Sequence, residues 1–149
     1  MARGNALGII ELASIGKGFE VQDAILKAAN VEKIIARTIC SGKYFIAIRG
    51  DVADVESAVA VGIEIGSYAI VNTATIPNLD PKVFPAIAGN TVFEQGQNGG
   101  HIGALLIIET FSVVSAIKAA DIACKEAELE LLRVHVAMAI GGKGFLVIT

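Results

Sequence analysis

The feature that most constrains the fold of this chain is an internal repeat. The segment at 8–14, GIIELAS, returns 98 positions later as LIIETFS at 106–112, and DAILK at 23–27 returns at the same offset as DIACK. After a two-residue gap, SGKYFI at 41–46 aligns with GGKGFL at 141–146. A repeat of this length indicates one structural unit present twice, so the elements predicted for the first copy apply to the second.

The first copy begins with a strand and a helix. Residues 6–13 form a short, continuous apolar run, which is typical of a central strand. Ser14 is in place to cap a helix, and apolar residues then recur with helical spacing at Val21, Ala24, Ile25 and Ala28. The pattern therefore predicts a strand followed by an amphipathic helix.

A hairpin, a second helix and a final strand follow. Residues 31–39 and 43–49 are rich in Ile and aromatic side chains, and Cys40-Ser41-Gly42 joins them as a tight turn. Asp51 is predicted to cap a helix whose apolar face holds Val52, Val55, Val59 and Ile63, and residues 68–76 are predicted as a strand. The order β-α-β-β-α-β predicts an α+β domain, an antiparallel sheet with both helices on one face.

The repeat also predicts the domain organisation. We expect a first domain at 1–87, a Gly- and Gln-containing linker at 88–100, and a second domain at 101–149. The second copy supplies a strand at 104–111, an alanine-striped helix and a hairpin at 131–149, but no counterpart of the second helix and last strand. Because half a domain would expose an unpaired strand edge, we expect that this copy is truncated at its C-terminus or completed from elsewhere.

Composition excludes several classes of function. The net charge is −3 and Lys and Arg are scattered singly, so neither nucleic acid nor an anionic membrane is an expected partner. No apolar run approaches the ~20 residues of a membrane span. The N-terminal residues lack the apolar stretch of a secretory signal, and two cysteines make no disulfide framework, so we expect a cytoplasmic location.

No catalytic constellation is apparent. Glu11 and Glu109 occupy matching places in apolar strands, where they could be paired catalytic carboxylates or structural residues with backbone or hydroxyl partners. The structural role is favoured because no His, Lys or second acid recurs beside them. With no Ser/His/Asp set and no Gly-rich phosphate loop, the sequence predicts that the protein is not an enzyme.

The two cysteines differ in setting. Cys40 lies in a polar turn, and its plainest interpretation is a small residue that happens to be cysteine. There is no C-x-x-C, and neither His101 nor His135 has a suitable spacing from it, so a metal site within one chain is not expected. Cys124 lies on one side of the second-copy helix and is predicted to be a small buried hydrophobe. We expect neither histidine to be a ligand.

These motifs resemble the bacterial microcompartment (BMC) shell proteins of the tandem-domain type. The resemblance lies in GIIELASIGKGFEVQDAILKAANV at 8–31, GDVADVESAVAVG at 50–62, the Gly-Lys hairpins and the repeat. It implies ferredoxin-like BMC domains, a homotrimer shaped as a pseudohexamer, and a place in a microcompartment shell beside other shell proteins. Within the family, the resemblance is strongest to the propanediol-utilisation shell protein of the iron–sulfur type. That type also has a cysteine before the first Gly-Lys pair and an Ile-Gly-Gly-Lys turn like the one at 140–143.

That resemblance gives Cys40 a collective role. Three Cys40 thiolates around a threefold pore would hold one [4Fe-4S] cluster per trimer, because thiolates are the usual ligands of such clusters. The resemblance implies that the cluster would pass electrons across the shell, to or from a redox protein on one side, or would plug the pore. The expected pore lining consists of Ile39, Ser41, Gly42, Lys43, Ile140, Gly141, Gly142 and Lys143.

Two pairs of lysines, at matching positions in the two copies, are the remaining candidate functional residues. Lys43 and Lys143 follow the turn glycines, and are either solvated or positive groups around the pore. Lys27 and Lys125 each follow an aspartate by four positions, the spacing of a helical ion pair. The resemblance implies that these two lysines lie at the edge of the tile and carry lateral assembly.

Two alternatives stay open on the sequence. The protein could be a plain shell tile whose pore passes metabolites without a cluster. It could also be a ferredoxin-like regulatory module that binds a small molecule in the cleft between the copies.

Overall fold

The first copy has the expected element order. The computed structural model describes residues 4–89 and 104–149. Its first-copy elements are β1 (Ala6–Leu12), α1 (Ile15–Ala28), β2 (Glu32–Ile39), β3 (Lys43–Gly50), α2 (Val52–Gly66), the 3-10 turn η1 (Ser67–Ala69) and β4 (Ile70–Ile76). The strands form one sheet in the order β2-β3-β1-β4. All its pairings are antiparallel, and α1 and α2 cover one face, so the predicted fold is confirmed.

The second copy repeats this plan over the residues described. A short helix, α3 (Val83–Ile87), precedes it in the chain. The second copy itself contains β5 (Leu106–Thr110), α4 (Val113–Glu126), β6 (Leu131–Val136) and β7 (Gly144–Ile148). Its sheet has the antiparallel order β5-β7-β6. Because β5, β7 and β6 correspond to β1, β3 and β2, the two sheets share one strand order.

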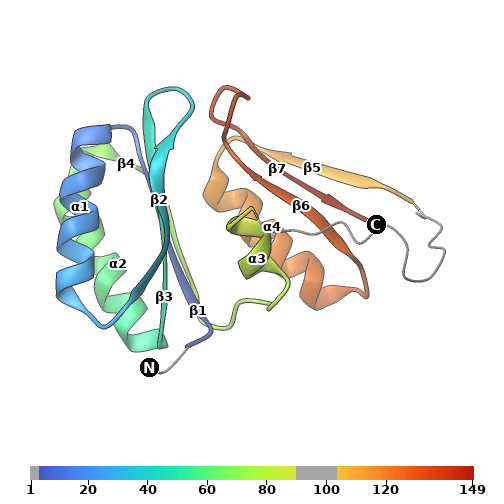
Figure 1. Cartoon of the computed structure of the whole chain (residues 1–149), viewed down its shortest axis with the longest axis horizontal. Coiled ribbons are helices and arrows are strands. Elements are labelled where there is room, and N and C mark those ends of the chain that lie inside the picture. Colours follow the sequence, from blue (N-terminus) through green and yellow to red (C-terminus); the bar gives the residue numbers. More distant parts are fainter. Residues whose placement is uncertain (1–3, 90–103) are drawn as a thin grey trace.

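The two copies stack in alternating layers. Figure 1 shows α1 and α2, then the first sheet, then α3 and α4, and then the second sheet. One core cluster contains residues of both copies, among them Leu7 and Phe45 from the first sheet and Val113 and Ile117 from α4. The copies are therefore joined by shared hydrophobic burial as well as by the chain.

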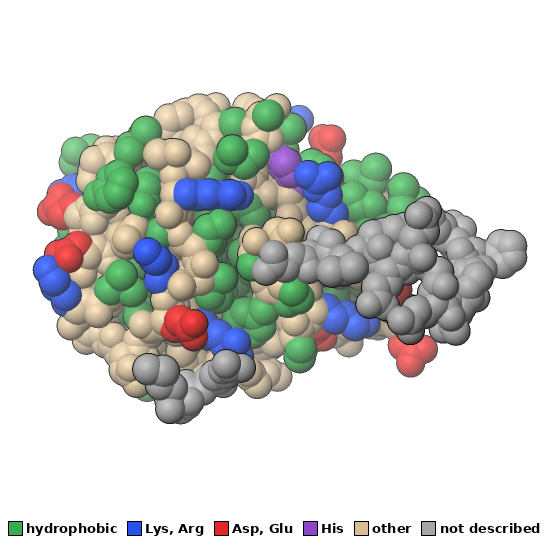
Figure 2. All heavy atoms as spheres, viewed as in Figure 1, with side chains coloured by type: hydrophobic (Ala, Val, Ile, Leu, Met, Phe, Trp, Pro, Cys, Tyr) green, Lys and Arg blue, Asp and Glu red, His purple; other side chains and the backbone are tan. Residues whose placement is uncertain are grey.

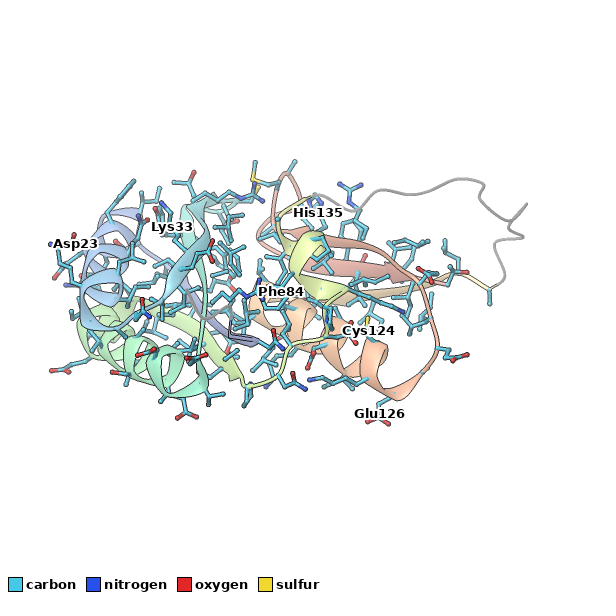
Figure 3. The ribbon with its side chains drawn as sticks, turned by 60° about the horizontal axis from the view of Figure 1, so that its bottom comes forward. Asp23, Lys33, Phe84, Cys124, Glu126 and His135 are labelled. Carbon is cyan, nitrogen blue, oxygen red and sulfur yellow. The ribbon has the colours of Figure 1, made fainter. Side chains whose placement is uncertain are left out.

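The domain boundaries remain a prediction. Residues 90–103, which include most of the expected linker, lie outside the described residues. The helix α3, at the end of the predicted first domain, packs against β6 and α4 of the second copy. Phe84 of α3 lies at the junction of the copies in Figure 3, where the Arg49 guanidinium stands 4.3 Å above its ring.

Local signals set the starts of the helices. Ser14 and Ser112 each accept a hydrogen bond at their Oγ from the backbone N–H three residues on, Lys17 at 3.3 Å and Ser115 at 3.4 Å. Asp51 holds the cap position of α2 but makes no side-chain cap bond. Among the described helices, none combines the length and the apolar character needed to cross a membrane.

The predicted apolar face of α2 needs a correction. Val55 and Val59 are buried as expected, but Val52 and Ile63 are exposed, and the buried stripe continues through Ala58 and Gly62 instead. The reason is close packing against β1: a Cβ on Gly62 would lie 2.4 Å from the Ile10 side chain. The helix therefore turns its small residues toward the sheet, which moves Val52 and Ile63 to the margin.

Candidate functional site

The hairpin turns of the two copies meet at one end of the molecule. The backbone N–H of Cys40, in the β2–β3 turn, donates to the Ala137 carbonyl at 3.0 Å. In return, the Ala139 N–H donates to the Cys40 sulfur at 2.7 Å. Figure 1 shows both hairpin tips at the same end of the stacked layers. The structure thus brings together the two turns that the sequence singled out, although about one hundred residues separate them.

Several residues in these turns have backbone φ angles that are uncommon outside glycine. Positive φ angles occur at Ser41 (66°), Ala137 (44°) and Ala139 (60°), which are not glycines, and such residues store backbone strain. Gly142, with φ of 83°, also lies close to the other turn: a Cβ there would be 3.4 Å from the Cys40 carbonyl oxygen. The hydrogen bonds between the turns hold the strained conformations in place.

Cys40 is the candidate ligand of this site. Its side chain is half-buried, and its sulfur accepts a hydrogen bond from the Ala139 N–H. Within residues 4–89 and 104–149, no group of three or more His, Cys, Asp or Glu side chains could hold a metal ion. Among the described residues, Cys40 is the cysteine that lies where the two turns meet.

The remaining expected pore residues differ in exposure. Ser41, Gly42 and Gly141 are exposed on the turns, whereas Gly142 is buried between them. Ile39 is buried within the shared core, and its place in the pore lining stays a prediction.

Glu11 is buried and bonded on two sides. Its carboxylate accepts a hydrogen bond from Lys43 Nζ at 2.9 Å and another from the Val113 backbone N–H at 3.1 Å. The predicted backbone partner is thus confirmed. Val113 is the first residue of α4, where a negative charge is favoured by the helix dipole. Glu11 therefore links the Cys40 hairpin to the first turn of the second-copy helix.

The sequence analysis missed the lysine beside Glu11. In the sheet, Glu11 pairs with Phe45, and Lys43 lies two residues along the same strand, on the same face. The strand register, once known, would have found this contact. Lys143 makes the equivalent contact with Glu109 at 3.5 Å, but both side chains are exposed.

The helix lysines form the predicted pairs. Lys27 Nζ lies 2.6 Å from Asp23, and Lys125 Nζ lies 2.6 Å from Asp121. The first pair is exposed, whereas Asp121 is buried and also accepts the Asp80 backbone N–H at 2.8 Å. Their role at a tile edge remains a prediction.

Cys124 and His135, which the sequence also singled out, lie in surroundings typical of structural residues. Cys124 is half-buried against the core, and burial raises the pKa of its thiol, with the Asp80 charge adding to the increase. His135 stacks on Phe145 with ring centroids 4.8 Å apart, and its Nε2 lies 2.6 Å from the Met138 carbonyl oxygen. His101 lies outside the described residues.

Charge is not concentrated on the face drawn in Figure 2. On the face drawn in Figure 2, basic and acidic side chains are interspersed among apolar ones. A hollow between the copies is lined by Arg37, Arg133 and His135 and by the end of α3. The regulatory alternative would need its ligand here, but His135 is already engaged by the Met138 carbonyl and the Phe145 ring.

Comparison with protein families matches residues 6–79 and 104–149 to the BMC domain. The chain belongs to the BMC domain family. It is 42% identical over 143 residues to the bacterial microcompartment shell protein PduT of Citrobacter freundii, across 96% of this chain and 74% of that protein. The carboxysome shell protein CcmK1 of Thermosynechococcus vestitus is 39% identical over 59 residues, which are 40% of this chain and 52% of that protein.

A solved structure agrees with the BMC assignment. The crystal structure of a microcompartment protein from Desulfitobacterium hafniense DCB superposes with a TM-score of 0.83 at 40% identity, covering 97% of this chain and 77% of that one. The protein is therefore a structural component of a bacterial microcompartment shell, and its family is not enzymatic. The family, the fold and the non-enzymatic role expected from the sequence are confirmed.

Proposed function

We propose that three copies of this BMC shell protein form a pseudohexameric tile around a central pore, where their Cys40 thiolates together hold one [4Fe-4S] cluster. The observation that carries the proposal is the position of Cys40. It lies where the hairpin turns of both copies meet, half-buried, with its sulfur bonded to a backbone N–H. Such a thiolate is held in place but is not enclosed by its own chain.

The surroundings of Cys40 suit a thiolate ligand. The Ala139 N–H offsets negative charge on the sulfur, and hydrogen bonds of this kind tune iron–sulfur centres. When bound, the cluster would supply one-electron redox chemistry in the shell. Lys43 is engaged by Glu11, so Lys143, which is about half exposed, is the turn lysine with more freedom to add positive charge near the pore.

The test is the iron content of protein purified without oxygen. We expect about four iron and four sulfide per trimer, with a brown absorbance that is lost in Cys40→Ala. Cys124→Ala is the matched control, because it removes the other thiol and should keep the iron. Wild-type protein that is trimeric but free of iron and sulfide would contradict the cluster and leave the plain metabolite pore. Iron retained in Cys40→Ala would contradict the ligand assignment.

Partners follow from the same proposal. The tile would lie among other shell proteins, and the cluster would pass electrons to or from a redox protein on one side of the shell. Hexagonal sheets seen by electron microscopy would support a tile. Their absence, together with a monomeric mass, would favour a regulatory module.

A further inference from the structure

The hollow between the two copies carries positive charge without a matching negative charge. Its lining includes Arg37 from β2 and Arg133 from β6, so each copy contributes one guanidinium. Both arginines are exposed, and no Asp or Glu among the described residues lines the hollow. In the described part of the chain, the carboxylates that form ion pairs do so with lysines, and neither arginine takes part. Two positive charges therefore border one hollow.

Arg37 approaches the hollow from the first sheet. It lies opposite Phe45 in the pairing of β2 with β3, and paired residues share one face of a sheet. Phe45 belongs to the core cluster shared with the second copy, as does Ile39, two positions from Arg37 on β2. Arg37 is thus a charged residue on the sheet face that is turned toward the second copy, at the edge strand.

Arg133 is positioned by its neighbour His135. The Arg133 Nη2 lies 3.1 Å from His135 Nδ1, and His135 Nε2 lies 2.6 Å from the Met138 carbonyl oxygen. Because a guanidinium only donates and a carbonyl only accepts, the imidazole carries its proton on Nε2 and is neutral. His135 therefore orients the Arg133 guanidinium without adding a charge of its own. Figure 3 labels His135 close to α3, whose end also lines the hollow.

The hollow has the size of a small-molecule site. Its volume is about 530 Å³, and ligand pockets usually measure about 300–1,000 Å³. The rest of the lining includes the buried apolar residues Ala86, Ile87 and Val134. A phosphate group occupies only part of this volume, so there is room for a small organic body attached to it.

We propose that this hollow binds the phosphate group of a small phosphorylated metabolite. Arg37 and Arg133 would donate to the phosphate oxygens, and His135 would hold Arg133 in position. Guanidinium groups match the geometry of phosphate, and two of them balance its two negative charges, whereas a carboxylate carries only one. Since one arginine comes from each copy, the bound phosphate would bridge the copies. The inference goes beyond the shell-tile function and does not depend on the Cys40 cluster.

The experiment is isothermal titration calorimetry of the full chain in a phosphate-free buffer of low ionic strength. The probes are glycerol 3-phosphate, inorganic phosphate and acetate, and we expect acetate to bind most weakly. Arg37→Gln and Arg133→Gln should each weaken binding of the phosphate ester about tenfold to a hundredfold, through loss of a charge-assisted hydrogen bond. Lys33→Gln is the matched control, because it removes one exposed positive charge from β2 outside the hollow and should keep the wild-type affinity.

Two variants of His135 test its positioning role. His135→Leu removes the acceptor of Arg133 and should weaken binding about tenfold. His135→Asn keeps a side-chain acceptor and should restore most of the affinity, which a loss of packing on Phe145 would not do. Circular dichroism and the melting temperature verify that each variant is folded.

Three results would overturn the inference. One is the absence of binding by both phosphate probes up to about 10 mM. Another is an equal affinity in the arginine variants and the Lys33→Gln control. Inorganic phosphate that binds more tightly than its ester would overturn the assignment to a phosphorylated metabolite. The iron content of the protein enters none of these measurements, so the proposed cluster fails or stands separately.

Discussion

At the scale of single residues, the repeated glutamates show how environment assigns a role. Glu11 and Glu109 occupy matching strand positions, yet Glu11 is buried between Lys43 and the start of α4, whereas Glu109 is exposed beside Lys143. A buried carboxylate is tolerated only where its charge and lone pairs are satisfied. Glu11 meets that condition through contacts from two distant parts of the chain.

Removing Glu11 should therefore destabilise the protein strongly. Glu11→Ala leaves the Lys43 ammonium and the Val113 N–H without their buried partner, and should lower the free energy of unfolding by about 3–5 kcal/mol. Glu11→Gln keeps an acceptor and should cost about 1–3 kcal/mol. Urea unfolding at fixed protein concentration measures both. The control Glu20→Gln removes an exposed pair with Lys17 and should change stability by less than about 1 kcal/mol; an equal loss there would contradict the argument.

At the scale of secondary-structure elements, close packing of α1 depends on one of its two early glycines. A Cβ on Gly18 would lie 2.3 Å from the Tyr44 ring, whereas nothing lies within 4 Å of a Cβ on Gly16. Tyr44 has little freedom to move, because it is buried and its hydroxyl donates to Gln22 at 2.7 Å. Gly16 and Gly18 lie in the same helix turn, but Gly18 faces the Tyr44 ring whereas Gly16 faces open space.

Alanine at the two positions should have opposite effects. Gly18→Ala should destabilise by about 1–3 kcal/mol through overpacking against Tyr44. Gly16→Ala should stabilise by up to about 1 kcal/mol, because alanine is the better helix former and has open space there. Thermal unfolding at equal protein concentration compares them. A melting temperature that falls in both variants, or rises in both, would show that the contact with Tyr44 does not decide the outcome.

At the scale of the whole molecule, the four alternating layers leave the lysines of α1 at an outer surface. Lys27 is exposed, and its ion-pair partner among the described residues is the exposed Asp23 of its own helix, a pair worth a few tenths of a kcal/mol. Its counterpart Lys125 pairs with the buried Asp121 instead. Lys27 is therefore exposed where the family resemblance implies a contact between assembled tiles, and this role stays a prediction.

Reversing this charge should separate tile formation from sheet formation. Lys27→Asp should keep the oligomer mass of the wild type but abolish the two-dimensional sheets seen by negative-stain electron microscopy. Lys33→Asp makes the same charge change at another exposed lysine, on β2, and should leave sheets intact. Normal sheets from Lys27→Asp would remove this lysine from the lateral contact.

The sequence by itself determined the element order of the first copy and the Ser14 cap, because each depends on patterns within a few residues, and a comparison of the sequence with itself showed the repeat. The apolar run at 6–13 predicted β1 as a central strand. Only the tertiary structure decided what covers each face, placing α4 over Leu7, Ile9 and Glu11 and bringing Ala139 to the Cys40 sulfur. These contacts join residues about one hundred positions apart, and local periodicity does not encode the packing angle and register between such distant segments.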